Sequence, residues 1–341
     1  MIWRDYHRRH TIHIESRHLA AVALITLLFG SGSVFAQSAD AARAYPTRAV
    51  RFVNPSSPGG GADIIARILA QQLTKSMVQN FLNDNRPGAA NIIATEIVAK
   101  SPPDGYTLLI AATGTFVTNP LVYAKLSYSE KDFDTISIVA DAPFILTVHP
   151  SVPAKNLNEL VALAKAHPGE LTYASFGTGS SSHLAGELFQ VMTKTRLLHV
   201  PYKGSAPGMT DLLAGNITMK FDSGFASVPY IQSKRIRALG VAALKRLPKI
   251  PDVPTLDALG LKNFEAGSWY GVMAPAGTPR DIVAKLHGEL VKALKLPEVQ
   301  QRIVDLGAYP IGNTPEEFSA QIIRERERWA QVVKEAGIKP E

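Results

Sequence analysis

Cysteine is absent from this chain of 341 residues. Its absence excludes disulfides, thiolate metal sites, a cysteine nucleophile and the lipid-bearing cysteine of a lipoprotein. Long apolar runs are lacking as well. The run over residues 19–30 is shorter than the roughly 20 residues that cross a bilayer, and no other segment is apolar enough to do so.

Several catalytic signatures are also missing. The chain has no GxSxG nucleophile elbow, HExxH zinc motif, GK[ST] phosphate loop or GxGxxG fingerprint. The net charge is +7, but the basic residues are scattered and form no stripe, so we expect no nucleic-acid binding. We therefore expect neither catalysis nor a cofactor, and a periplasmic hydrolase remains the alternative.

The first 36 residues have the layout of a secretory signal peptide. Four arginines precede residue 18, a short apolar run follows, and Val34-Phe35-Ala36 forms a cleavage site before Gln37. A membrane anchor is the alternative reading of this segment. We expect cleavage after Ala36 and a freely diffusing periplasmic protein.

Strand and helix signals alternate along the remaining chain. Short apolar runs predict strands at residues 49–54, 106–112, 144–148, 171–174, 217–222 and 237–242. Residues 62–78 have helical spacing. Thr278 is the expected N-cap of one later helix, and Thr314–Glu317 reads as the capping box of another. The alternation favours an α/β fold with parallel sheets covered on both sides, and the length favours two lobes.

Glycine-rich or polar turns follow several of these strands. In open α/β sheets, ligands bind at the carboxyl ends of strands, beside helix N-termini whose free N–H groups favour anions. Each turn could also be an ordinary helix start, and His183 fits a structural role better than a ligand contact. The candidate ligand-binding residues are Ser56, Ser57, Pro58, Gly59, Gly60 and Asp63 in the first turn; Gly177, Thr178, Gly179, Ser180 and Ser181 in the second; and Thr113, Thr115 and Asp222 at other strand ends.

Read in order, these turns resemble the tripartite tricarboxylate transporter receptors, or Bug-type extracytoplasmic solute-binding proteins. The matching stretches span essentially the whole mature chain. They include Tyr45-Pro46-Thr47-Arg48, Pro58-Gly59-Gly60-Gly61-Ala62-Asp63, Asn85-Arg86-Pro87-Gly88-Ala89, Pro103-Asp104-Gly105-Tyr106, His183-Leu184-Ala185-Gly186-Glu187, Val200-Pro201-Tyr202-Lys203-Gly204 and Ala274-Pro275-Ala276-Gly277-Thr278-Pro279.

The resemblance implies two α/β lobes joined by two crossing strands, as in the flytrap fold of periplasmic binding proteins. We place the crossings near residues 141–148 and 265–274. Lobe one is then 45–142 plus 269–341, and lobe two is 143–268. The carried-over site holds a carboxylate in the loop Ser56–Asp63, opposite Gly177–Ser181, with Thr113, Thr115 and Asp222 on the walls.

The same resemblance implies partners. The ligand would be a small carboxylate, and a monomeric receptor would deliver it to the membrane subunits of a tripartite tricarboxylate-type transporter. A sensory role upstream of a membrane kinase is the alternative.

The chain departs from the family pattern at two places. Ser56 stands where the family often has Phe, and Gly88–Ala94 replaces a more glycine-rich stretch. The loss of a ring at Ser56 predicts a larger or more polar ligand than a four-carbon dicarboxylate, such as an aromatic acid. The alternative is that Phe52, Phe116 or another side chain refills the space.

Overall fold

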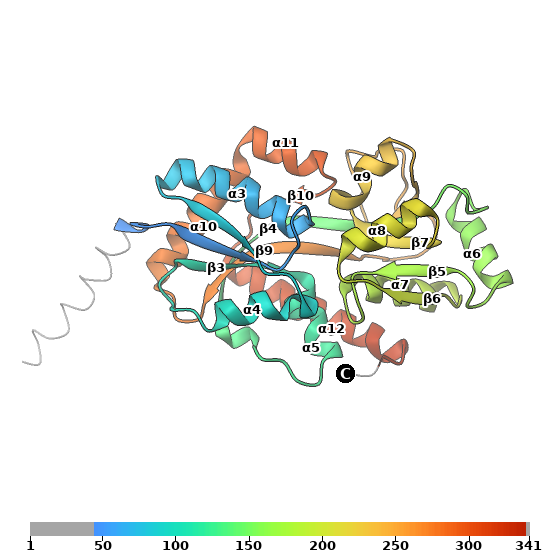
Figure 1. The fold of residues 1–341 in the computed structure, drawn as a ribbon, viewed down its shortest axis with the longest axis horizontal. Helices are drawn as coiled ribbons and strands as arrows, with labels where there is room; N and C mark the ends of the chain where they lie inside the picture. Colours follow the sequence, from blue (N-terminus) through green and yellow to red (C-terminus); the bar gives the residue numbers. More distant parts are fainter. Residues whose placement is uncertain (1–43, 339–341) are drawn as a thin grey trace, which may run out of the picture. The chain divides into compact units, whose positions relative to one another are not determined.

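One long strand is shared by the two halves of the sheet (Figure 1). The computed structural model describes residues 44–338. Its strands are β1 (Val50–Asn54), β2 (Phe81–Asn85), β3 (Thr107–Ala112), β4 (Phe133–Val148), β5 (Thr172–Ser175), β6 (Leu198–Pro201), β7 (Met219–Ser223), β8 (Arg237–Val241), β9 (Gly267–Pro275) and β10 (Tyr309–Pro310). They pair in the order β2-β1-β3-β9-β4-β7-β5-β6, and β8 and β10 also pair with β4.

Strand β4 carries the chain from one half of the sheet to the other. Residues 133–143 pair with β9, whereas residues 144–148 pair with β7 and β8. A second crossing lies beside the first, because the N–H of Phe144 donates to Ala266 O at 2.9 Å just before β9 begins. The contacts join the chain from Pro46 onward into one compact unit, so the residue bounds of the two lobes stay a prediction.

The expectation of purely parallel sheets is wrong. Strands β1, β2 and β3 are parallel, as are β5, β6 and β7. However, β9 runs antiparallel to β3 and β4, and β4 runs antiparallel to β7 and β8. The crossing strands therefore make each half mixed. The sequence signal covered only the end of β4, because Asp134, Ser137 and Asp141 interrupt the apolar pattern of its first part.

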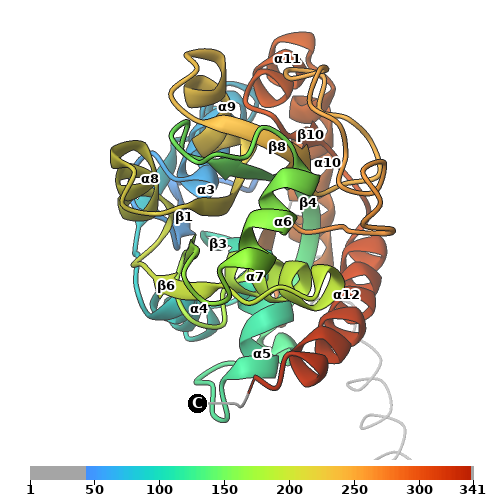
Figure 2. The ribbon, with the colours of Figure 1, turned by 90° about the vertical axis from the view of Figure 1, so that its right-hand side faces the viewer.

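Helices cover both faces of each half (Figures 1 and 2). In the first half, α3 (Gly61–Met77) and α10 (Arg280–Lys295) lie on one face, and α4 (Ile92–Ala99), α5 (Asn119–Val122) and α12 (Pro315–Glu335) lie on the other. In the second half, α8 (Ser205–Ala214) and α9 (Gly224–Gln232) lie opposite α7 (Ser181–Thr193). Within residues 44–338 the structure also has the α-helices α6 (Leu157–Ala166) and α11 (Pro297–Asp305), and the short helices η1 (Ala89–Asn91), η2 (Gly114–Thr118) and η3 (Glu130–Asp132).

The local sequence explains how these helices begin and pack. Helix α3 buries Ile65, Ile68, Leu69 and Leu73, which recur at helical spacing. The capping box of α12 forms as predicted at Thr314. The predicted N-cap Thr278 is wrong: α10 begins at Arg280, and the Thr278 hydroxyl donates instead to Pro275 O at 2.7 Å.

The predicted signal peptide, residues 1–36, lies outside the described residues. Within residues 44–338, none of the helices combines the length and apolar character that a bilayer crossing requires.

Candidate functional site

The first glycine-rich turn joins β1 to α3 and leaves the start of α3 without a side-chain cap. Gly60 is the N-cap residue, and Ile64 is the first residue whose N–H bonds back to it, at 3.0 Å. The N–H groups of Gly61, Ala62 and Asp63 donate to no acceptor among residues 44–338. Such groups at a helix N-terminus can donate to an anion.

Asp63 holds this turn in shape. Its buried carboxylate accepts from Gly59 N at 2.9 Å, from Asn83 Nδ2 at 2.6 Å and from Asn85 Nδ2 at 3.0 Å. Arg67 also donates to it. Burial alone would raise the pKa of Asp63, but the hydrogen bonds from Arg67, Gly59 and Asn85 outweigh burial and lower it. The carboxylate thus supports the turn, and its contact with a ligand stays a prediction.

The second turn joins β5 to α7 and is capped. Ser180 is the N-cap residue; its hydroxyl accepts from His183 N at 3.3 Å and donates to Gly177 O at 2.6 Å. Gly177 and Gly179 have φ of 131° and 74°, conformations that favour glycine. Ser181, the first residue of α7, is buried.

The threonines after β3 connect neighbouring elements. Thr113 Oγ1 accepts from Trp269 N at 2.9 Å, and Thr115 O accepts from the Tyr128 hydroxyl at 2.7 Å. Asn91 Nδ2 lies 3.5 Å from Thr115 Oγ1. Both threonines are buried, so each has at least one structural role at this strand end.

Asp222 is paired within the protein. Its Oδ2 accepts from Lys220 Nζ at 2.5 Å and from the Ser205 hydroxyl at 2.6 Å, and its Oδ1 accepts from Ser223 N at 2.8 Å. Lys220 and Asp222 are both fully buried. Lys220 was not among the residues predicted from the sequence. Its position two residues before Asp222 on β7 puts both side chains on one face of the strand.

Two aromatic side chains bring the first turn next to the end of β7. A Cβ placed on Gly61 would lie 2.2 Å from the Tyr270 hydroxyl oxygen and 3.2 Å from Phe225. The two rings pack edge to face at 5.6 Å, and Tyr270 is buried. The sequence contained no pattern that singled out Tyr270 or Phe225, because their meeting depends on the pairing of β9 and β4.

The second turn lies against α5, the short helix that follows β3 in the sequence. A Cβ on Gly179 would lie 2.3 Å from Val122 Cγ2. Each glycine-rich turn therefore packs closely against elements distant in the sequence: the first against Tyr270 of β9 and Phe225 of α9, and the second against Val122 of α5. The predicted residues differ in access: Ser57, Pro58, Gly59 and Thr178 are exposed; Ser56, Gly60, Gly177 and Ser180 are partly buried; and Asp63, Thr113, Thr115, Gly179, Ser181 and Asp222 are buried.

Neither aromatic ring named as a replacement for the missing Phe lies free to fill that space. Phe52 packs against Phe81 at 5.4 Å, and Phe116 packs against Tyr128 and Phe133. Both rings are buried in the core. A role for Ser56 in ligand size stays a prediction.

Comparison with known proteins identifies the family. The model of the tripartite tricarboxylate transporter family receptor matches residues 65–338. The chain belongs to this receptor family. It is 37% identical to Protein BugT of Bordetella pertussis over 301 residues, which cover 86% of this receptor and 91% of BugT.

Two solved structures with ligands are similar to this receptor. The R. palustris protein Rpa4515, with adipate, is 38% identical, has a TM-score of 0.84, and matches over 87% of this chain and 100% of its own. MatC (Rpa3494) from Rhodopseudomonas palustris, with bound malate, is 32% identical, has a TM-score of 0.79, and matches over 85% and 100%. The family and the fold are thus those of solute-binding receptors.

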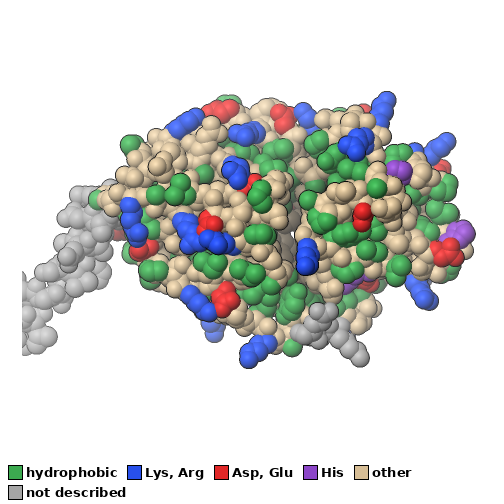
Figure 3. Space-filling model, viewed as in Figure 1, with side chains coloured by type: hydrophobic (Ala, Val, Ile, Leu, Met, Phe, Trp, Pro, Cys, Tyr) green, Lys and Arg blue, Asp and Glu red, His purple; other side chains and the backbone are tan. Residues whose placement is uncertain are grey.

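Neither a basic stripe on the face drawn in Figure 3 nor a metal-binding cluster among the described residues is present. On the face drawn in Figure 3, lysines and arginines are spread among acidic side chains and form no single stripe. Within residues 44–338, no cluster of three or more His, Asp or Glu side chains is arranged to hold a metal ion.

Proposed function

We propose that this receptor is a periplasmic solute-binding protein that captures a small carboxylate at the two glycine-rich turns. The observation that carries the proposal is the start of α3, where three successive N–H groups donate to no acceptor among the described residues. A carboxylate oxygen can accept from such groups and interacts favourably with the helix dipole.

The second turn supplies a complementary set of donors. Helix α7 has no acidic residue in its first turn. The N–H groups of Ser181 and Ser182 donate to no acceptor within residues 44–338. A ligand with two anionic groups could use both helix starts. The adipate and malate in the two similar structures are dicarboxylates and support this ligand class.

Two further parts of the proposal concern location and partners. The protein is exported with cleavage after Ala36, and it delivers its ligand to the membrane subunits of a tripartite tricarboxylate-type transporter. The family description supports the second part. N-terminal sequencing of the periplasmic protein tests the first: Gln37 is the expected first residue, and a membrane-bound chain that retains residues 1–36 contradicts it.

A thermal-shift screen tests the ligand class. It compares linear dicarboxylates, hydroxy acids, amino acids and aromatic acids, with the diamide of adipate as an uncharged control of similar shape. Ligand at about 100 times its Kd adds about 2.7 kcal/mol to the free energy of unfolding. Mass spectrometry should recover the ligand intact. Stabilisation by no carboxylate, or conversion of the ligand to a product, contradicts the proposal.

A further inference from the structure

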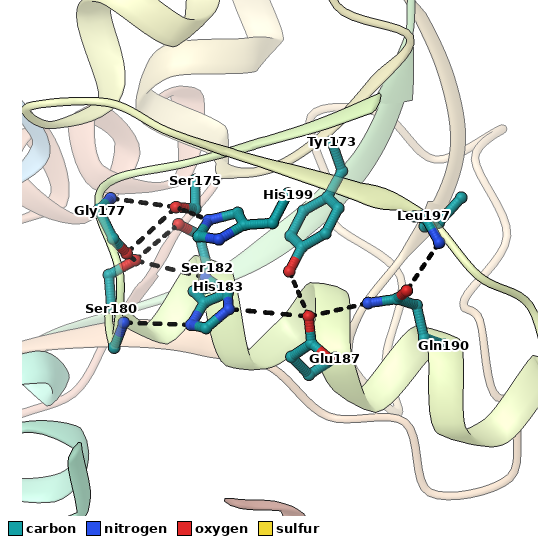
Figure 4. Close-up of polar contacts among 11 residues, drawn as sticks. Tyr173, Ser175, Gly177, Ser180, Ser182, His183, Glu187, Gln190, Leu197 and His199 are labelled. Atoms are coloured by element: carbon teal, nitrogen blue, oxygen red, sulfur yellow. Dashed lines mark hydrogen bonds and ion pairs between the residues drawn. The ribbon is translucent and has the colours of Figure 1, made fainter. Parts of the chain in front are cut away.

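His183 closes the second turn from the helix side (Figure 4). The Gly179 N–H donates to His183 Nδ1 at 3.1 Å, while the His183 N–H donates to Ser180 Oγ at 3.3 Å. The arrangement is similar to a capping box, in which the third helical residue reaches back to the N-terminal backbone. A Glu or Gln normally has this role, and here an imidazole has it.

A column of stacked rings holds this imidazole in place. The His183 ring stacks on the His199 ring at 4.0 Å, and His199 stacks on Tyr173 at 4.9 Å. His199 Nε2 in turn lies 2.6 Å from the hydroxyl of Ser175, which also contacts Gly177. Both ends of the turn are therefore attached to the same column (Figure 4).

The imidazole is neutral near pH 7. Burial lowers the pKa of His183 to about 4, and burial together with the proximity of His183 lowers the pKa of His199 to about 3. Since Nδ1 accepts the Gly179 N–H, the proton of the neutral ring lies on Nε2. That nitrogen faces Glu187 Oε1 at 3.7 Å, and the Tyr173 hydroxyl and Gln190 donate to the same carboxylate.

The geometry points to His183 as a positioning residue that fixes the Gly177–Gly179 turn with a neutral acceptor and keeps negative charge away from the start of α7. This inference rests on the proposed function, because the absent charge matters only if an anion binds there. A carboxylate side chain could accept the same N–H. Its negative charge would also interact favourably with the dipole of α7, but it would repel an anionic ligand.

A matched pair of variants separates positioning from simple structural support. In His183→Asn, Oδ1 can occupy the place of Nδ1 as a neutral acceptor, and His183→Asp has the same shape with a negative charge. Both lose the stacked ring equally. Both substitutions are made in a Glu187→Gln background, which removes the carboxylate that faces this position. We expect the Asp variant to melt at the same temperature as the Asn variant or higher, yet to bind adipate or malate at least about tenfold more weakly, the effect of a nearby unit charge in a partly buried site. Affinities that follow the melting temperatures overturn the inference.

A measurement without ligand distinguishes failure of this inference from failure of the proposed function. Amide hydrogen exchange of Gly179 is followed by NMR in the wild type, His183→Asn and His183→Leu. Gly179 should be protected in the first two and exchange at least about tenfold faster in His183→Leu, which offers no acceptor. Equal protection in all three overturns the positioning role. If the exchange pattern holds but neither adipate nor malate binds the wild type, the ligand proposal fails and the fixed turn remains.

Discussion

Gly61→Ala tests the contact that places the start of α3 against β9. The new Cβ would lie 2.2 Å from the Tyr270 hydroxyl oxygen and 2.8 Å from Cζ of the same ring. Tyr270 is buried and packs edge to face on Phe225, so the ring cannot move without disturbing the packing around it. Overpacking of this kind costs about 1–3 kcal/mol.

The expected result is a fall in the melting temperature of about 2–10 °C, together with weaker carboxylate binding because the N–H groups of α3 shift. Differential scanning calorimetry and titration calorimetry measure the two effects. Gly288→Ala is the matched control, since Gly288 lies within α10 and its Cβ would meet no atom within 4 Å. That substitution should leave stability unchanged or raise it by about 0.4–1 kcal/mol.

A double mutant makes the prediction specific. Tyr270→Phe removes the oxygen with which the new Cβ collides, so Gly61→Ala should cost less in that background than in the wild type. Strict additivity of the two substitutions, or a Gly61→Ala protein with wild-type melting temperature and affinity, refutes the contact between the α3 start and Tyr270.

Three other outcomes follow from buried charges and from the first turn. Lys220→Met leaves the buried Asp222 carboxylate without its cation and should lower the free energy of unfolding, measured by urea denaturation, by about 3–5 kcal/mol. The double variant Lys220→Met, Asp222→Leu should recover most of this stability. An equal loss of stability in the double variant contradicts the pairing. Burial, with repulsion from Glu325 and Glu265, raises the pKa of Asp141 to about 6. Because this pKa in the folded protein exceeds the ordinary value, the free energy of unfolding should fall as pH rises from about 4 to 6. Asp141→Asn should remove this pH dependence and add up to about 3 kcal/mol of stability at pH 7. An unchanged pH dependence in the variant refutes the raised pKa of Asp141. Ser56→Phe should weaken binding of the native ligand and admit smaller acids if Ser56 lines the pocket, whereas unchanged selectivity in a folded variant excludes that role.

The sequence predicted the parts of the fold that depend on local patterns. The apolar run before the first turn, the helical spacing of residues 62–78 and the capping box at Thr314 all depend on neighbours within a few residues, and all three elements form. The first part of β4 escaped prediction because its polar residues make no apolar run, although pairing with β9 fixes it as a strand.

The positions of the two turns could be predicted from the sequence, but the hydrogen-bond partners of their side chains could not. Glycines and serines beside helix starts identified both turns. Some partners of Asp63 and Asp222 lie far from them in the sequence: Asn83 comes from β2, and Ser205 comes from the start of α8. Such pairings depend on register, which residue types alone do not reveal. The role of His183 could not be predicted for the same reason, because it depends on the His199 ring from β6 that stacks on it.

Calorimetric titration of the mature protein tests the central claim most directly. Adipate and malate are each titrated in parallel with the diamide of adipate, at low and at moderate ionic strength. We predict saturable one-to-one binding of at least one carboxylate and none of the diamide, because the N–H groups that lack an acceptor at the starts of α3 and α7 select charged oxygens. Equal binding of the diamide, or no binding of any carboxylate in the wider screen, would contradict it.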